Sequence, residues 1–522
     1  MRVWLPALLA AALVVGGAAV AALLAWPAGA VGASTSGLAT VDLPAFAGRV
    51  GGVSVVDARG RQVPVVLRGD TVWPRRRLSP GVRLTVTTRI RRPAWIGWLV
   101  GREVVRRTTL VTPLARLRST LLRPRPGAVV RAEYDMPVSR IAVGHGRGRR
   151  LAPGRASVPL GVVARGRARA GTTTVAAAAR PWETLSKPVR VSWFVAGRRP
   201  QAVAAPAVGG PLAPDGTLTL TFSEPVSALL GARRPRLEPA VRGRWRVTGR
   251  YTLSFRPAGF GFGLGGTVRL RLPRPVVVGG RVTRLVSWRV PTGSTLRLQQ
   301  LLAQLGYLPL RWRPAAPQAT DPRAEVAAAV SPPRGVFSWR YPNTPAPLRA
   351  LWSPGRWNVV TEGAVMRFED EHGLATDGVA GPQVWRALLR DERAGRRSPN
   401  GYSYVFVHET VPESLNLWHD GRIILTSPGN TGIPQAPTAP GTWPVFEHIP
   451  VGTMSGTNPD GSHYDDPGVR WISYFHGGDA IHAFPRASYG TPQSLGCVEL
   501  PFAAAERVWP YTPVGTLVTV EP

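Results

Sequence analysis

Cysteine, lysine and acidic residues are scarce in this sequence of 522 residues, and each scarcity excludes something. The single cysteine, Cys497, excludes an intrachain disulfide. The single lysine, Lys187, means that arginine carries nearly all the positive charge. Charged residues make up 18% of the chain and hydrophobic residues 44%, which excludes wholesale disorder. The 58 glycines and 53 prolines exclude a coiled coil or an all-helical bundle. The length predicts several domains.

The scarcity of acids is confined to the first part of the chain. Residues 1–290 hold 47 basic and 10 acidic side chains, whereas residues 291–522 hold 18 arginines and 20 acids. A basic region of this kind indicates a polyanionic partner, for which nucleic acid is the usual candidate. The N-terminus argues against that candidate.

A long hydrophobic run, Val3–Trp26, follows Arg2 and precedes the small residues Ala28-Gly29-Ala30. This pattern is typical of a secretory leader, and about 20 apolar residues can also span a bilayer. We therefore predict that residues 1–33 are a signal peptide or a membrane anchor. Either outcome places the rest of the chain outside the cytoplasm, secreted or anchored through residues 3–26. Nucleic acid is then not the expected partner, and anionic envelope polymers are.

Short runs that alternate in polarity fill the region from Thr40 to about Val290, separated by glycine and proline. Alternation at period two is typical of half-buried strands, and this density of short strands predicts β-sandwiches. The stretch 128–138 is echoed by 217–226, with Tyr134 and Phe222 88 residues apart. We predict a β-module at 40–115 and immunoglobulin-like β-sandwiches at 116–200 and 201–292. The last resembles bacterial immunoglobulin-like domains, through Phe222-Ser223-Glu224-Pro225-Val226, Gly243-Arg244-Trp245 and Phe255-Arg256-Pro257.

The period changes after Thr295. Leucines at 298, 301, 302 and 305 predict an amphipathic helix that ends at Gly306. A second helix is expected from Thr361 and a third over 383–389, with a long loop at 311–358 and a linker at 391–402. Residues 295–390 resemble the small three-helix peptidoglycan-binding domain. The resemblance rests on these segments: Leu305-Gly306-Tyr307, Phe368-Glu369, and Asp377-Gly378-Val379-Ala380-Gly381-Pro382.

Two interpretations of this helical region stay open. It binds wall polymers, or it is a spacer whose long insertion covers the sugar groove. Three tryptophans of the insertion are candidates either for stacking on sugars or for anchoring the loop: Trp339, Trp352 and Trp357.

Seven of the eight histidines lie after residue 371, as does Cys497. His482 precedes Cys497 by 15 positions. A free thiol has a pKa of about 8.5, and a nearby imidazole can take its proton to form a thiolate–imidazolium pair. Gly496 allows close backbone approach and lets amides point toward an oxyanion. This combination suits acyl transfer through a thioester.

The surrounding residues resemble the catalytic domain of L,D-transpeptidases (YkuD-type), which we expect over 403–522. The resemblance rests on Ile481-His482, on Ser494-Leu495-Gly496-Cys497-Val498-Glu499, and on an upstream turn near Thr442-Trp443. It departs from the family at Leu495, where a second histidine is usual, and at Glu499, where arginine is usual. His419-Asp420-Gly421 predicts a hairpin turn within this β-rich domain.

The resemblance implies a role for each matching residue. Cys497 is the expected nucleophile and His482 the base, oriented by the carbonyl of Ala483. The amides of Gly496 and Cys497 are expected at the oxyanion, and Ser494 is expected to shape the loop. Tyr474 and His476 are candidates for lining the substrate pocket. The implied substrate is a peptidoglycan stem peptide, with no cofactor and no metal.

Three alternatives use the same residues. Water as the acceptor would make the protein an L,D-carboxypeptidase. A degenerate domain would leave a non-catalytic wall-binding protein. A zinc cluster of a metallopeptidase would use five residues, although no ligand motif supports it: His463, Asp465, Asp466, His476 and His482.

Overall fold

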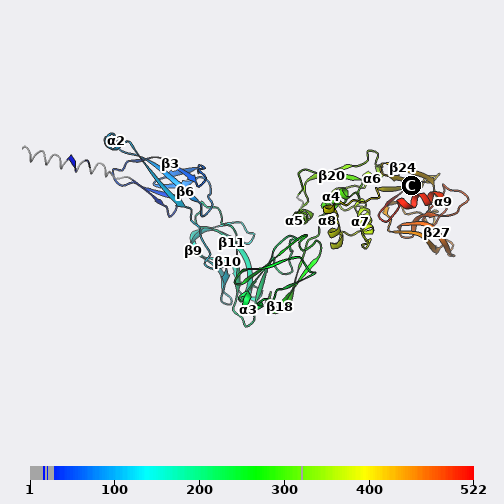
Figure 1. The fold of residues 1–522 in the computed structure, drawn as a ribbon, viewed down its shortest axis with the longest axis horizontal. Coiled ribbons are helices and arrows are strands. Elements are labelled where there is room, and N and C mark those ends of the chain that lie inside the picture. The colour runs from blue at the N-terminus through cyan, green and yellow to red at the C-terminus, as the bar shows by residue number, and fades with distance from the viewer. Residues whose placement is uncertain (1–15, 18–19, 21–28, 319–320) are drawn as a thin grey trace, which may run out of the picture. The chain divides into compact units, whose positions relative to one another are not determined.

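The computed structural model describes residues 16–17, 20, 29–318 and 321–522. The fold is mainly β, with 44% strand and 16% helix, which confirms the predicted class (Figure 1). Most of the predicted leader lies outside the described residues. No helix in the described part of the chain is both long and apolar enough to cross a bilayer. The chain divides into two compact units, one comprising mainly residues 1–203 and the other mainly residues 204–522.

The first β-module consists of two sheets. A four-stranded sheet has the order β1-β2-β5-β4 (Ala30–Ala33, Ala39–Asp42, Thr71–Pro74, Val65–Arg68), and a three-stranded sheet has the order β3-β6-β7 (Arg49–Asp57, Arg83–Arg91, Glu103–Val111). Helix α2 (Ala94–Val100) joins β6 to β7. Alternate residues of β6 are buried, as the period-two pattern predicts. Val41 and Val72 of one sheet share a buried cluster with Val55 and Val86 of the other.

The second β-module is a five-stranded sheet, β10-β9-β11-β12-β8. Its strands span Arg149–Val163, Val129–Val143, Ala170–Ala178, Val189–Phe194 and Leu121–Leu122, and a 3-10 turn, η1, spans Gly166–Arg169. A buried cluster that includes Tyr134 and Trp193 forms its core.

Two further sheets follow. One has the order β13-β14-β17-β16 (Ala202–Ala205, Leu218–Phe222, Thr252–Pro257, Gly243–Gly249) and the other β15-β18-β19 (Arg236–Glu238, Thr267–Val278, Arg281–Arg289), with α3 at Val226–Leu230. The immunoglobulin-like assignment of these modules stays a prediction.

The helical region contains more regular structure than the sequence suggested. The expected helices are present as α4 (Thr295–Leu305), α7 (Val359–Glu371) and α8 (Pro382–Ala394). The predicted loop at 311–358 is wrong, because it holds the hairpin β20–β21 (Leu310–Pro314, Gly335–Trp339) and helices α5 (Pro322–Val330) and α6 (Ala346–Ala350). Asp321 caps α5 by accepting from the amides of Arg323 and Ala324. Proline at a first helical position is compatible with a helix.

Two helix ends differ from expectation. Asn358, not Thr361, caps α7, because its side chain accepts from the Thr361 amide. Helix α8 continues to Ala394, four residues into the predicted linker, and ends at Gly395 with φ of 63°. Asp391 in this last turn is buried and lies 2.6 Å from His372 Nε2, which holds the turn against α7.

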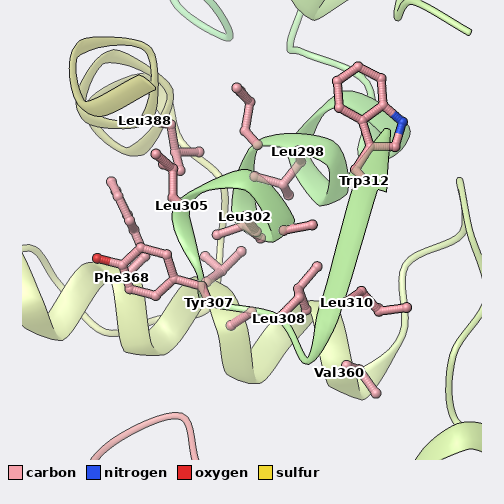
Figure 2. Close-up of a cluster of buried hydrophobic side chains, with 14 of the residues drawn as sticks. Leu298, Leu302, Leu305, Tyr307, Leu308, Leu310, Trp312, Val360, Phe368 and Leu388 are labelled. Atoms are coloured by element: carbon pink, nitrogen blue, oxygen red, sulfur yellow. The ribbon is translucent and has the colours of Figure 1, made fainter. Parts of the chain in front are cut away.

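Helices α4 to α8 and the hairpin contribute side chains to one apolar core. Figure 2 shows Leu298, Leu302 and Leu305 of α4 directed toward Phe368 of α7 and Leu388 of α8. Trp352 and Trp339 pack against this core, so these two tryptophans are anchors, while Trp357 is exposed. The same core continues into the next domain through Tyr404, Trp418 and Leu517.

The C-terminal domain consists of two sheets and a short helix. The five-stranded sheet has the order β24-β23-β22-β30-β25 (Arg422–Pro428, Ser414–His419, Ser403–His408, Leu517–Glu521, Gly441–Pro444). The four-stranded sheet has the order β26-β27-β28-β29 (Glu447–Thr457, His463–His476, Asp479–Ala483, Val498–Leu500). Helix α9 spans Phe502–Val508, followed by the 3-10 turn η2 at Trp509–Tyr511. The predicted turn is confirmed, with positive φ at Asp420 and Gly421 between β23 and β24.

At one point the helical region and the C-terminal domain approach each other backbone to backbone. A Cβ atom on Gly363 of α7 would lie 2.5 Å from the Gly515 carbonyl oxygen, and one on Gly515 would lie 2.2 Å from that of Gly363. Gly515 also has φ of 87°, a conformation that favours glycine. Only two glycines permit this approach of helix and loop.

Candidate active site

Strands β28 and β29 lie side by side in parallel, with His482 level with Glu499 and Ile481 level with Val498. Ile481 and Val498 point into the buried core between the two sheets. Side chains alternate along a strand, so His482 and Glu499 occupy the opposite face. Cys497 immediately precedes β29 and shares the face of Glu499 by the same alternation. The pairing therefore brings the two residues singled out by the sequence to one face of adjacent strands.

Cys497 lies in apolar surroundings. It packs against the small cluster of Val469, Ile472 and Ala480, and its Sγ lies 3.7 Å from the Gly478 carbonyl oxygen. Burial raises the pKa of the Cys497 thiol to about 12, and the nearby Asp479 and Glu499 carboxylates act in the same direction. The resting sulfur is therefore a neutral thiol.

His482 is 3% exposed, and its Nδ1 lies 3.1 Å from the carbonyl oxygen of Ala483. A carbonyl oxygen only accepts, so Nδ1 carries the proton and the lone pair is on Nε2. Burial lowers the pKa of His482 despite the opposing effects of the Ala483 carbonyl and Glu499. The imidazole is therefore neutral and has the tautomer that a base needs.

The pKa shifts of Cys497 and His482 bear on the thiolate–imidazolium pair expected from the sequence. Both shifts favour the neutral forms, because desolvation disfavours both charges. Among the described residues, no hydrogen bond joins Cys497 Sγ to His482. The arrangement suits a base that takes the thiol proton during attack rather than a preformed ion pair.

The turn before Cys497 is held by Ser494. Its Oγ accepts from the Gly496 amide at 3.2 Å and donates to the Cys497 carbonyl at 2.6 Å. The Gly496 amide is thus engaged, so the Cys497 amide is the better candidate for an oxyanion. Gly496 has φ of 112°, and a Cβ there would lie 2.4 Å from Asp479 Oδ1, so glycine is required at this position.

Glu499 forms the strongest ion pair near the cysteine. Arg486 donates from Nε and Nη2 to the two carboxylate oxygens of Glu499, both at 2.7 Å, and from Nη2 to the Gln493 carbonyl at 3.1 Å. Glu499 is 4% exposed. A bidentate pair of this geometry is among the strongest that side chains form. It ties the loop between β28 and β29 to the strand that follows Cys497.

The comparisons with known proteins agree with this geometry. Residues 394–520 match the sequence model of the L,D-transpeptidase catalytic domain. The chain carries an L,D-transpeptidase catalytic domain. Residues 352–388 match the model of the putative peptidoglycan-binding domain, which covers α7 and the first part of α8. No curated protein sequence matches this chain.

Solved transpeptidases were also found. An L,D-transpeptidase from Mycobacterium smegmatis is 14% identical, over 62% of this chain and 99% of its own, with a TM-score of 0.22. The catalytic domain of the L,D-transpeptidase from E. faecium is 25% identical, over 24% of this chain and 100% of its own, also with a TM-score of 0.22. L,D-transpeptidase 3 from Mycobacterium tuberculosis, in complex with a faropenem-derived adduct, is 13% identical over 61% and 97%, with a TM-score of 0.21.

Tyr474 and His476, the two residues expected to line the substrate pocket, have different neighbours. Tyr474 packs against the same small cluster as Cys497. His476 lies 3.5 Å from Asp479 and 4.3 Å, ring to ring, from Trp443 of the predicted upstream turn. His476 therefore contacts Asp479, and Asp479 in turn borders the Gly496 turn that carries Cys497.

Asp479 and Arg486 were missed by sequence reasoning. Asp479 accepts from the Ala439 amide at 3.0 Å and contacts the Gly496 turn, which joins the upstream turn to the nucleophile loop. A signal for Arg486 was present. It is the only cation between His482 and Cys497, in a sequence that has an acid at 499 where the family has arginine.

The five residues of the zinc alternative do not gather. Within the described ranges, no group of three or more histidine, cysteine, aspartate or glutamate side chains is placed to hold a metal ion. His463 and Asp465 lie toward the exposed start of β27, whereas His482 is buried on β28.

Proposed function

We propose that this protein is exported and cross-links peptidoglycan stem peptides through a thioester on Cys497. The proposal is supported by the pairing of β28 with β29, which sets His482 level with Glu499, two residues after Cys497, and by the contact of His482 Nδ1 with the Ala483 carbonyl. The transpeptidase domain supplies the reaction class, and the peptidoglycan-binding segment agrees with the substrate.

The neutral resting pair defines the first step. His482 Nε2 takes the Cys497 thiol proton as sulfur attacks the carbonyl carbon of the third residue of a donor stem, whose amide bond leads to D-alanine. The Cys497 amide donates to the oxyanion. The carbon–nitrogen bond then breaks, and the imidazolium gives its proton to the departing amine of D-alanine.

The second half of the reaction reverses these roles. An amine of a neighbouring stem attacks the thioester and passes a proton to His482, and the sulfur leaves as a thiol after reprotonation. The product is a 3→3 cross-link.

The basic residues 1–290 are expected to lie close to anionic envelope polymers. Attraction by exposed arginines of this kind is screened by salt within about 10 Å at 0.1 M. The helical region would contribute the wall contact, with Trp357 as its exposed tryptophan.

Intact-mass measurement after mixing the full chain with a carbapenem tests the nucleophile. We expect one adduct, located on Cys497 by peptide mapping and absent from Cys497→Ala. His482→Asn should slow adduct formation by about 10²–10⁴-fold, the usual contribution of a positioned base. His463→Asn is the matched control, because this exposed histidine belongs to the same sheet.

A folded protein that stays unmodified although iodoacetamide reaches the thiol would contradict the enzyme reading. Product analysis with isolated stem peptides then separates the acceptors. Cross-linked dimers indicate transpeptidation, whereas shortened stems alone indicate a carboxypeptidase. Retained wall binding by Cys497→Ala would assign binding and chemistry to different regions.

A further inference from the structure

Three large aromatic side chains are exposed together at one end of the first β-module. Phe46, Trp95 and Trp98 are 72, 61 and 77% exposed. Phe46 and Trp98 line the same open hollow of about 920 Å³, and the Trp98 indole donates to the Trp95 carbonyl at 3.0 Å. We call these three residues the α2 patch. Water-exposed aromatic surface of this size is disfavoured unless something covers it.

The surroundings of the α2 patch are strongly basic. The hollow is lined by one acid, Glu103, and by four arginines: Arg49, Arg91, Arg92 and Arg102. Glu103 pairs with Arg91 at 3.1 Å, which leaves an excess of positive charge around the aromatic rings. The residues of α2 itself carry no charge. An apolar tip with an arginine rim is complementary to a surface that is anionic outside and apolar beneath.

The backbone fixes this presentation. Phe46 has φ of 68°, a left-handed conformation that a residue with a bulky side chain rarely adopts. The conformation directs the ring outward rather than into the core, where Ala47 is buried instead.

The position of Gly29 indicates what kind of surface the α2 patch contacts. Strand β1 begins at Ala30, and the Gly29 carbonyl accepts from Arg106 of β7 at 3.3 Å. Gly29 also lies against Ile90 of β6. Helix α2 joins β6 to β7 close to Ile90, so it lies at the same end of the module as Gly29 (Figure 1). The hydrophobic run Val3–Trp26 ends only three residues before Gly29.

We propose that the α2 patch docks on the surface of an anionic phospholipid bilayer. The aromatic rings enter the interface between head groups and acyl chains, where tryptophan is favoured, and the arginines contact lipid phosphates. A soluble polyanion would use the arginines but would leave the three rings in water. The first β-module is thereby held against the membrane surface by the α2 patch itself.

A single reporter dye tests this with the full chain. Cys497→Ala removes the only native thiol, and Ala94→Cys then places one environment-sensitive fluorophore beside Trp95. Ala58→Cys is the matched control, because it is exposed and lies beyond the far end of β3, whose Arg49 end borders the patch. Both are reconstituted in phosphatidylcholine vesicles with or without about 30% phosphatidylglycerol, so that each is equally tethered.

We expect the dye at position 94 to shift to the blue and to be quenched by aqueous iodide about fivefold less in the anionic vesicles, as for a group that enters the interface. The dye at position 58 should show neither change. Trp95→Ser with Trp98→Ser should abolish the effect while the thermal unfolding temperature stays unchanged, since both rings are exposed.

Equal quenching at positions 94 and 58 would overturn the proposal. So would protection that survives the double serine variant but disappears at about 0.5 M salt, because that result assigns the contact to arginine and a polyanion alone. Protection at position 94 in detergent-free buffer without vesicles would instead indicate a second protein molecule, and would also overturn it.

Discussion

Arginine is used in opposite ways in the two halves of the chain. Before residue 290 the arginines of the ion pairs are mostly exposed, at 71% for Arg61, 58% for Arg91 and 54% for Arg271. After residue 290 the exposed fractions start much lower, at 1% for Arg297, 17% for Arg367 and 30% for Arg486, although Arg393, Arg323 and Arg396 are exposed at 40, 42 and 75%. An arginine can be buried only where an acid accompanies it. The supply of acids therefore decides which half uses charge for its surface and which uses it to hold the fold together.

Removing a buried pair should have the largest effect. Arg486→Ala leaves the buried Glu499 unpaired, which costs about 3–5 kcal/mol. We also expect carbapenem adduct formation to fall by at least about 10²-fold, because the turn carrying Cys497 loses its anchor. Thermal unfolding and intact mass measure both effects.

Arg422→Ala is the control, since this arginine is exposed on the same domain. The double variant Arg486→Ala with Glu499→Ala should recover part of the lost stability, as coupled partners are not additive. If Arg486→Ala unfolds no more easily than Arg422→Ala, the distinction between buried and surface arginines fails.

Glu369 tests the comparison from the side of the acid. It is a buried carboxylate of the second half that has no arginine partner among the described residues. It accepts from the Gly378 amide at 2.9 Å, and burial raises its pKa to about 7. Because the folded pKa exceeds the unfolded value, stability falls as pH rises from about 4.5 to 7. Glu369→Gln should therefore stabilise the protein at pH 8 by up to about 3 kcal/mol, and by almost nothing near pH 4.

Chemical denaturation of both proteins across this pH range measures the difference. A constant gain at every pH would mean that glutamine merely packs better and that Glu369 does not titrate on folding.

Asp479 has a smaller expected effect, on reactivity. Its carboxylate raises the pKa of Cys497, so Asp479→Asn should lower that pKa and speed alkylation by iodoacetamide at pH 8 about 3–10-fold. The full pH profile, read by mass spectrometry at Cys497, should move to lower pH. An unchanged profile would show that burial alone sets the thiol pKa. His476→Gln is a control, because it removes the Asp479 partner without removing the carboxylate.

The smallest effect is expected on the surface of the first half. Arg107→Gln and Arg246→Gln remove exposed charges, so each should change the unfolding free energy by less than about 0.5 kcal/mol. Urea denaturation measures this. A loss of several kcal/mol at either position would show that surface arginines also stabilise the fold, and the contrast between halves would disappear.

The parts of the site that depend on local pattern could be predicted from the sequence. The Gly496-Cys497 turn, the strand bearing His482 and the hairpin at Asp420-Gly421 all have short-range signals. Helix α5 was missed because prolines around it resemble a loop, although Asp321-Pro322 is a good helix start.

What could not be predicted depends on long-range partners and burial. Arg486 is 13 residues from Glu499, and only the fold shows that they meet. The expected thiolate pair assumed an exposed site, whereas the surroundings of Cys497 and His482 favour neutral groups. Sequence shows which ionisable residues are present but not how much water reaches them.

The paired glycines 363 and 515 have a mechanical consequence. At these two glycines α7 meets the loop before β30 backbone to backbone, and Leu517 and Arg367 pack closely beside the contact. If the helical region binds a glycan strand, this close contact would hold the strand at a constant distance from Cys497. Which neighbouring stem is joined would then be chosen by that distance as much as by recognition of the peptide itself.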